Sequence, residues 1–125
     1  MSAFVRFAAL CGVLALAAGP AAAIDQPPYE KQLLRLSEIL GAVQYLGNLC
    51  GGEDGSIWHD KMAALLDSEA ASPERRRRLT ASFNRGFRTF EETYRACTPS
   101  ARFAITRYMG EGARISGDIA ARYSR

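Results

Sequence analysis

Apolar residues recur every three or four positions through four separate stretches of the chain, which is the spacing of amphipathic helices. The first stretch runs from Pro28 to about Leu49, the second from Ile57 to Glu69, the third from Pro73 to about Ala96, and the fourth from Pro99 almost to the C-terminus. The apolar stripe of the first is broad enough to need neighbours on two sides. No stretch shows the alternation of a convincing β-strand, so the pattern predicts an all-α chain.

Turn and capping residues separate the four stretches. Ser72 and Thr98 each precede a proline, the combination of an N-capping hydroxyl and a first-turn residue that begins many helices. Ser56 is expected to cap the second helix, and Gly51 or Gly52 to end the first in the left-handed conformation. The connections are short, so consecutive helices should run antiparallel and form an up-down bundle.

The N-terminal residues have the organisation of a cleavable signal peptide. Arg6 precedes an uncharged stretch from Phe7 to Ala18, Gly19-Pro20 interrupts it, and Ala21-Ala22-Ala23 supplies the small residues that signal peptidase reads. A membrane-spanning helix needs roughly 20 apolar residues, more than this stretch has. We therefore expect a signal peptide at residues 1–23, a single domain at residues 24–125 and a periplasmic location. The alternatives are an uncleaved N-terminal anchor and a lipid anchor on Cys11.

Loss of Cys11 with the signal peptide would leave a matched pair of cysteines, Cys50 and Cys97. An exported chain with an even number of cysteines is expected to oxidise them. An up-down bundle brings the ends of its first and third helices together, where these two residues lie. Their disulfide would contribute about 4 kcal/mol on the chain-entropy account. The expected fold is therefore a small four-helix up-down bundle clamped by one disulfide, and a redox-active or metal-binding pair is the alternative.

Composition and motifs narrow the functional classes. The chain is 48% hydrophobic and 23% charged, as a folded domain is, and its net charge of +3 is too mild to indicate a nucleic-acid partner. His59, the single histidine, is adjacent to Asp60, and consecutive helical residues do not face each other as a catalytic pair must. The haem-attachment motif is absent. We expect no cofactor, no metal, no catalytic residue and no transmembrane segment in the mature chain, so an enzyme is the less favoured class.

The run Arg75-Arg76-Arg77-Arg78 is the most conspicuous charged feature. Four consecutive residues on a helix point in directions about 100° apart, so they cannot form a flat patch. Their position in the first turns is disfavoured by the helix dipole, which makes an anionic partner conceivable. The plainer interpretation is a solvated helix end, partly paired with Glu69 or Glu74.

Glycines inside the predicted helices need an offsetting role, because each costs up to about 1 kcal/mol relative to alanine. Gly112 lies on the apolar stripe of the fourth helix, which predicts close contact with another helix. Gly110 and Gly117 lie on the flank of that stripe, where a second helix or a ligand could approach. Nearby, Glu111 can pair with Arg107 and Arg114 on the same helix.

Several of these segments together resemble a family of small exported alphaproteobacterial proteins of unknown function. The residues that carry the resemblance are Tyr29, Leu33–Gly41, Tyr45-Leu46, Leu49-Cys50, Phe83-Asn84-Arg85-Gly86-Phe87, Tyr94, Cys97-Thr98, Arg107-Tyr108 and Glu111-Gly112. The resemblance implies export, an alphaproteobacterial host and the Cys50–Cys97 pairing, and it implies no activity. Its motifs mark six candidate binding residues: Asn84, Gly86, Arg107, Tyr108, Glu111 and Gly112.

Two functions fit these observations. The first is an exported binding or adaptor protein of the bacterial cell envelope, presenting a helix face or the Arg75–Arg78 end to an envelope protein or a wall component. The second is a small-ligand carrier or an enzyme, with an interhelical site near Asn84, Arg107, Tyr108 and Glu111.

Overall fold

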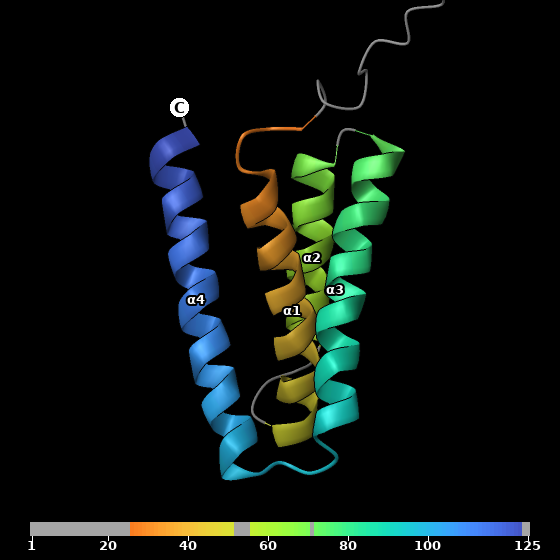
Figure 1. Ribbon diagram of the computed structural model, residues 1–125, viewed down its shortest axis with the longest axis vertical. Helices are drawn as coiled ribbons and strands as arrows, with labels where there is room; N and C mark the ends of the chain where they lie inside the picture. The colour runs from red at the N-terminus through yellow and green to blue at the C-terminus, as the bar shows by residue number, and fades with distance from the viewer. Residues whose placement is uncertain (1–25, 52–55, 71, 124–125) are drawn as a thin grey trace, which may run out of the picture.

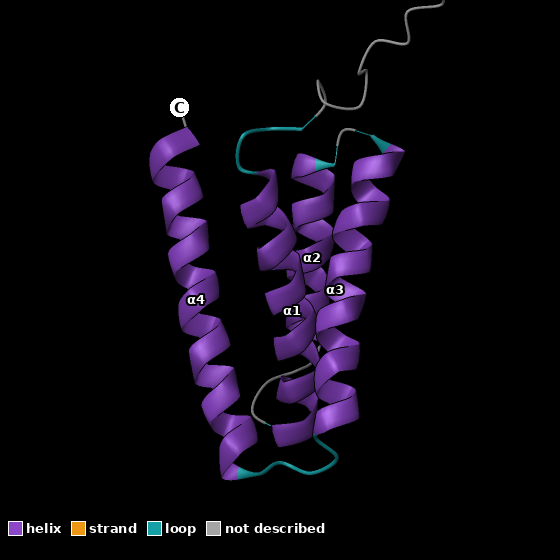
Figure 2. Cartoon of the chain, in the orientation of Figure 1, coloured by secondary structure: helices purple, strands orange, loops and turns teal. Residues whose placement is uncertain are grey.

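The computed structural model describes residues 26–51, 56–70 and 72–123, and all the regular structure in them is helical (Figures 1 and 2). The helices are α1 (Glu30–Cys50), α2 (Ser56–Glu69), α3 (Pro73–Thr93) and α4 (Pro99–Tyr123). The prediction of four helices and no strands is confirmed for this part of the chain. The predicted signal peptide and the loop at residues 52–55 lie outside the described residues.

The predicted helix boundaries are mostly confirmed. The Ser72 hydroxyl accepts a hydrogen bond from the Arg75 backbone N–H at 3.2 Å, and the Thr98 hydroxyl accepts one from that of Ala101 at 3.1 Å. Gly51 ends α1 in the left-handed conformation, with φ of 65°. α3 ends at Thr93, earlier than expected, because Tyr94 is extended and its carbonyl accepts a hydrogen bond from the Tyr45 hydroxyl.

The helices alternate in direction, and α1 is the common neighbour of the other three. Figure 1 shows α1 in the middle, with α3 on one side and α4 on the other. The backbone of α4 approaches α1 alone among the described helices, and the backbones of α2 and α3 approach each other only slightly. The predicted up-down order is therefore confirmed. The packing is less even than in a square bundle, because α4 has a single backbone neighbour.

The contact between α1 and α3 is a backbone contact made at two glycines. A methyl group at Gly41 would lie 1.9 Å from the carbonyl oxygen of Phe83, and one at Gly86 would lie 1.9 Å from that of Glu38. Ser37 and Ser82, each one helical turn before a glycine, are also buried in this half of the molecule. Small residues spaced four apart let two helices approach until Cα–H groups meet carbonyl oxygens.

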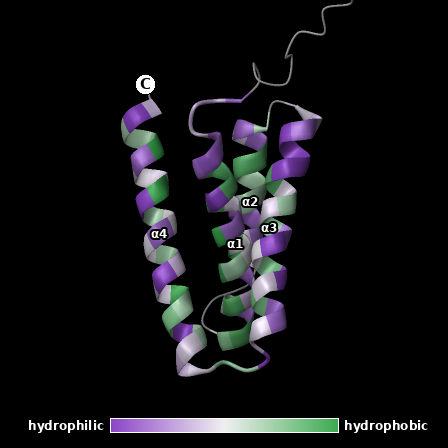
Figure 3. Cartoon of the chain, in the orientation of Figure 1, coloured by the Kyte–Doolittle hydropathy of each residue, from purple (hydrophilic) through white to green (hydrophobic). Residues whose placement is uncertain are grey.

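The largest apolar side chains pack beside this contact. Leu33, Leu40, Met62 and Leu79 form a cluster joining α1, α2 and α3, and Trp58 and Phe83 pack against it. Hydrophilic and hydrophobic residues alternate along α4 (Figure 3), and its buried residues are Ala101, Gly112 and Ile115. Among the described helices, none has a stretch long and apolar enough to cross a membrane.

A buried ion pair ties α1 to α3 at the end opposite the disulfide. The Arg75 guanidinium lies 2.7 Å from the Glu30 carboxylate, and the two residues are only 4% and 5% exposed. Arg75 also donates to the backbone carbonyl of Glu69, the last residue of α2. Because a buried charge is costly without its partner, this pair fixes how the three helix ends meet.

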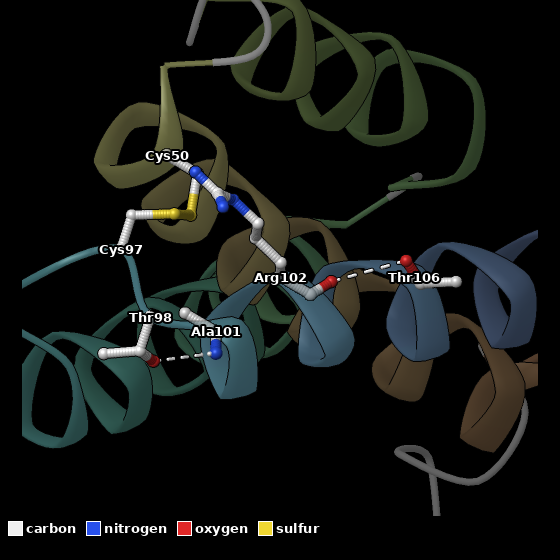
Figure 4. Close-up of a disulfide and its surroundings, with 6 residues drawn as sticks. All are labelled: Cys50, Cys97, Thr98, Ala101, Arg102 and Thr106. Carbon is white, nitrogen blue, oxygen red and sulfur yellow. Dashed lines mark hydrogen bonds between the residues drawn. A yellow bond between two sulfur atoms is a disulfide. The ribbon is translucent and has the colours of Figure 1, made fainter.

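The Cys50–Cys97 disulfide closes the other end, as predicted (Figure 4). It joins the last residue of α1 to the loop between α3 and α4. Since α1 is the only described helix whose backbone approaches α4, this bond also fixes the start of α4 against the helix on which it packs.

The glycine contact predicts opposite effects for the same substitution at different sites. Gly41→Ala and Gly86→Ala should each lower the free energy of unfolding by about 2 kcal/mol or more, because backbone atoms must move apart. Gly117 has open space around it, so Gly117→Ala should raise that free energy by about 0.5–1 kcal/mol. Urea unfolding followed by circular dichroism measures all three. Equal effects at the three positions would rule out the backbone contact.

The disulfide predicts a specific chemical and thermodynamic result. Alkylation without reductant should modify neither Cys50 nor Cys97, and replacing both by serine should lower the free energy of unfolding by about 4 kcal/mol. Intact-mass spectrometry and urea titration provide the measurements. Ready alkylation of the unreduced protein would contradict the bond.

Candidate functional site

The described surface has an elongated apolar groove between α2 and α4, with α1 as its floor. It consists of an upper cavity of about 400 Å³ and a lower one of about 290 Å³ nearer the disulfide, which share Leu36 and Ser116 in their walls. The side chains that form the floor are all aliphatic: Leu33, Leu36, Ile39, Leu40 and Val43. These residues explain why the apolar stripe of α1 is so broad, since part of it lines the groove.

The two walls differ in side-chain size. α2 contributes mostly large or long side chains, with Trp58 and Lys61 in the lower cavity and Leu65, Ser68 and Glu69 in the upper one. α4 contributes mostly small ones; its lining residues are Met109, Gly112, Ala113, Ser116, Ile119, Ala120 and Tyr123. The α4 wall is therefore low and smooth through its middle.

The geometry of α1 sets the width of the groove. Leu33 and Leu40 share a cluster with Met62 of α2, whereas Ile39 lies under Gly112 of α4, so the two neighbours occupy directions roughly a quarter turn apart. With each helix 8–10 Å from α1, the axes of α2 and α4 are about 13 Å apart. That is wider than two packed helices, but it leaves no room for another helix between them. A spacing of this order suits a single extended chain lying along α1.

The Tyr29 and Tyr123 rings lie at the upper end of the groove. Their centroids are 4.9 Å apart, and the Tyr29 hydroxyl donates a hydrogen bond to the Glu69 carboxylate at 3.1 Å. Burial first, and then this hydrogen bond, raise the pKa of Tyr29. The two rings join the N-terminal end of α1 to the C-terminal end of α4.

A polar cluster lies on the opposite side of α4, facing α3. The Arg35 guanidinium of α1 binds Glu111 of α4 through two hydrogen bonds of 3.1 and 2.7 Å. The guanidinium also lies 5.2 Å from the centre of the Tyr108 ring, which meets the Phe90 ring of α3 edge-on at 5.1 Å. Arg107 and Arg114 help to line a polar cavity of about 520 Å³ beside these groups. Glu111 is predicted to pair with Arg107 and Arg114 within α4, but it pairs instead with Arg35 of α1.

The structure separates the six candidate binding residues into three places. Arg107, Tyr108 and Glu111 come together in the polar cluster. Asn84 lies on the outer side of α3 and lines a shallow cavity with Arg76 and Arg77. The other two, Gly86 and Gly112, are buried where helices meet. Gly86 lies against the α1 backbone, and a Cβ added at Gly112 would lie 3.3 Å from the Ile39 side chain. The predicted close helix contact at Gly112 is thus confirmed.

The four consecutive arginines occupy different environments. Arg75 is buried against Glu30, Arg76 is exposed and 3.4 Å from Asp67, Arg77 is exposed, and Arg78 is half-buried. Arg75 reaches only the backbone carbonyl of Glu69, not its carboxylate. His59 is exposed on α2, and no group of three potential metal ligands occurs among the described residues.

Sequence reasoning did not identify the groove or Arg35. The groove depends on which helices stay apart, and periodicity within one helix carries no information about that. Arg35 lies within the first motif of the resemblance, but its partner Glu111 is 76 positions away. Only the breadth of the α1 stripe gave a signal, by indicating two neighbours.

The Arg35–Glu111 pair predicts a loss of stability in acid. The hydrogen bond from Arg35 is the main cause of a lowered Glu111 pKa. A carboxyl group with a lowered folded-state pKa stabilises the fold above its unfolded pKa of about 4.5, and that stability is lost as the pH falls through the folded value. Glu111→Gln should therefore reduce the free energy of unfolding at neutral pH and flatten its decline below about pH 5.

Urea titrations across a pH series measure this effect. Glu91→Gln, which changes an exposed carboxylate at the end of α3, is the matched control. An unchanged acid slope in Glu111→Gln would show that the pair contributes nothing to pH-dependent stability.

Comparison with known proteins gives a family without a known activity. No curated protein and no solved structure matches the chain. Residues 28–123, which include all four helices, match the pattern of DUF2385, a family of proteins of unknown function. Since this match spans most of the sequence and both cysteines of the disulfide, the chain belongs to the DUF2385 family.

Proposed function

We propose that this chain is an exported binding protein of the bacterial cell envelope, acting in the periplasm after removal of residues 1–23. We propose further that its site is the groove between α2 and α4, and that the ligand is a single extended apolar chain of the acyl type. The observation that carries the proposal is the groove itself, with its aliphatic floor and its two adjoining cavities of about 400 and 290 Å³.

The length of the groove supports a chain-like ligand. Its floor extends from Leu33 to Val43, which corresponds to about 15 Å along the axis of α1 at the α-helical rise. A compact ligand would fill one of the two cavities and leave the other in contact with water. An extended chain would cover the floor of both and bury apolar surface at about 25 cal/mol per Å².

The polar groups of the groove favour binding over catalysis. Ser68, Ser116, Lys61 and Glu69 are distributed along it, and the Ser68 hydroxyl donates to the Leu65 carbonyl within its own helix. None of these described groups is paired as a nucleophile with a base. The disulfide is consistent with an oxidising compartment such as the periplasm.

Narrowing the groove tests the proposal. The neutral apolar dye N-phenylnaphthylamine should fluoresce on binding the purified protein, and dodecanol should displace it. Ala113 faces the lower cavity, so Ala113→Leu should weaken dye binding about tenfold, whereas Ala121→Leu, the same change outside the cavity linings, should leave it unchanged. Equal affinity in both variants, or displacement failing in the native protein, would refute the groove as the site.

A further inference from the structure

We infer that the ligand of the groove is an anionic amphiphile, whose acidic head group is held by Lys61 at the disulfide end while its chain extends toward Tyr29 and Tyr123. This inference rests on the proposed function. It adds the charge of the ligand and the direction in which it lies.

The charges in the groove have opposite signs at its two ends. Among the described residues, Lys61 is the only charged one that lines the lower cavity, and Glu69 is the only charged one that lines the upper cavity. A carboxylate or phosphate would be repelled at the Glu69 end and attracted at the Lys61 end. The distribution therefore favours an acidic head group in the lower cavity.

Lys61 is available for such a contact. Glu69 already accepts a hydrogen bond from Tyr29, whereas the Lys61 ammonium has no ion-pair partner within the described part of the chain. The ammonium lies 6.0 Å from the centre of the Trp58 ring, and Trp58 lines the same cavity. The ring and the ammonium would thus hold the first part of the chain and its head group side by side.

The ends of the groove give it a direction as well. The Tyr29 and Tyr123 rings lie together at the upper end and line it with aromatic surface, which suits the tail of a chain. α2 begins at the lower end, with Trp58 and Lys61 in its first two turns, so the positive pole of the α2 dipole lies beside the lower cavity.

A pair of probes that differ only in the head group tests the inference. In the native protein, dodecanoate should displace N-phenylnaphthylamine at about fivefold lower concentration than dodecanol, the effect of a partly exposed ion pair. The preference should shrink as salt is added, because screening weakens the attraction. In Lys61→Met the two probes should become equal, and in Lys61→Glu dodecanol should bind more tightly.

The matched control is Lys31→Met, which removes the only other lysine, an exposed residue of α1 outside the groove lining. It should keep the preference for dodecanoate. Monoacyl phosphatidylglycerol has the same anionic chemistry on a larger head group. If it displaces the dye at a lower concentration than dodecanoate does, the ligand is a lysolipid; if dodecanoate does so, the ligand is a free fatty acid.

Each outcome decides a separate point. Equal displacement by dodecanol and dodecanoate in the native protein would overturn the inference and leave the apolar groove in place. A preference that persists in Lys61→Met would show that the head group is held elsewhere and would also overturn it. Failure of both probes would refute the proposed function, and the inference with it.

Discussion

The backbone contact between α1 and α3 is the constraint on which the rest of the structure depends. Gly41 and Gly86 each lie against a carbonyl oxygen of the other helix, so no side chain fits between the two helices there. Larger residues are displaced to the sides of the contact, where the Tyr45 and Phe87 rings meet edge-on at 5.4 Å. With one narrow face of α1 used by α3, most of its broad apolar stripe remains for α2 and α4.

That distribution explains why α4 is held differently from the other helices. Among the described helices, only α1 has a backbone that approaches α4. In place of a second helix neighbour, three separate links hold α4: the disulfide at its start, the bond from Arg35 to Glu111 in its middle, and the Tyr29–Tyr123 contact at its end. Links spaced along a helix can fix its position without filling the space on both sides of it. The groove is the space left on the side of α2.

Local rules in the sequence were enough to predict the helices, three of their boundaries and the disulfide. Periodicity, capping hydroxyls and glycine at helix ends act within a few residues, and the up-down order follows from short connections. The roles of Arg75, Gly86 and the groove depend on contacts between helices far apart in the sequence. Arg75, for example, belongs to a run of four arginines that the sequence places at a solvated helix end. In the fold it is buried against Glu30, which lies 45 positions earlier and which no local rule identifies as its partner.

The polar cluster and the groove lie on opposite sides of α4, and the first supports the second. The bidentate bond from Arg35 to Glu111 holds α4 against α1, and the contact of Tyr108 with Phe90 draws it toward α3. Gly112, Ala113 and Ser116 are small enough to let α4 move toward α2, so nothing in their size keeps the groove open. The attraction on the far side of α4 is what keeps the groove open. The motif residues of α4 therefore position the wall of the groove, in the same way that Gly41 and Gly86 position its floor.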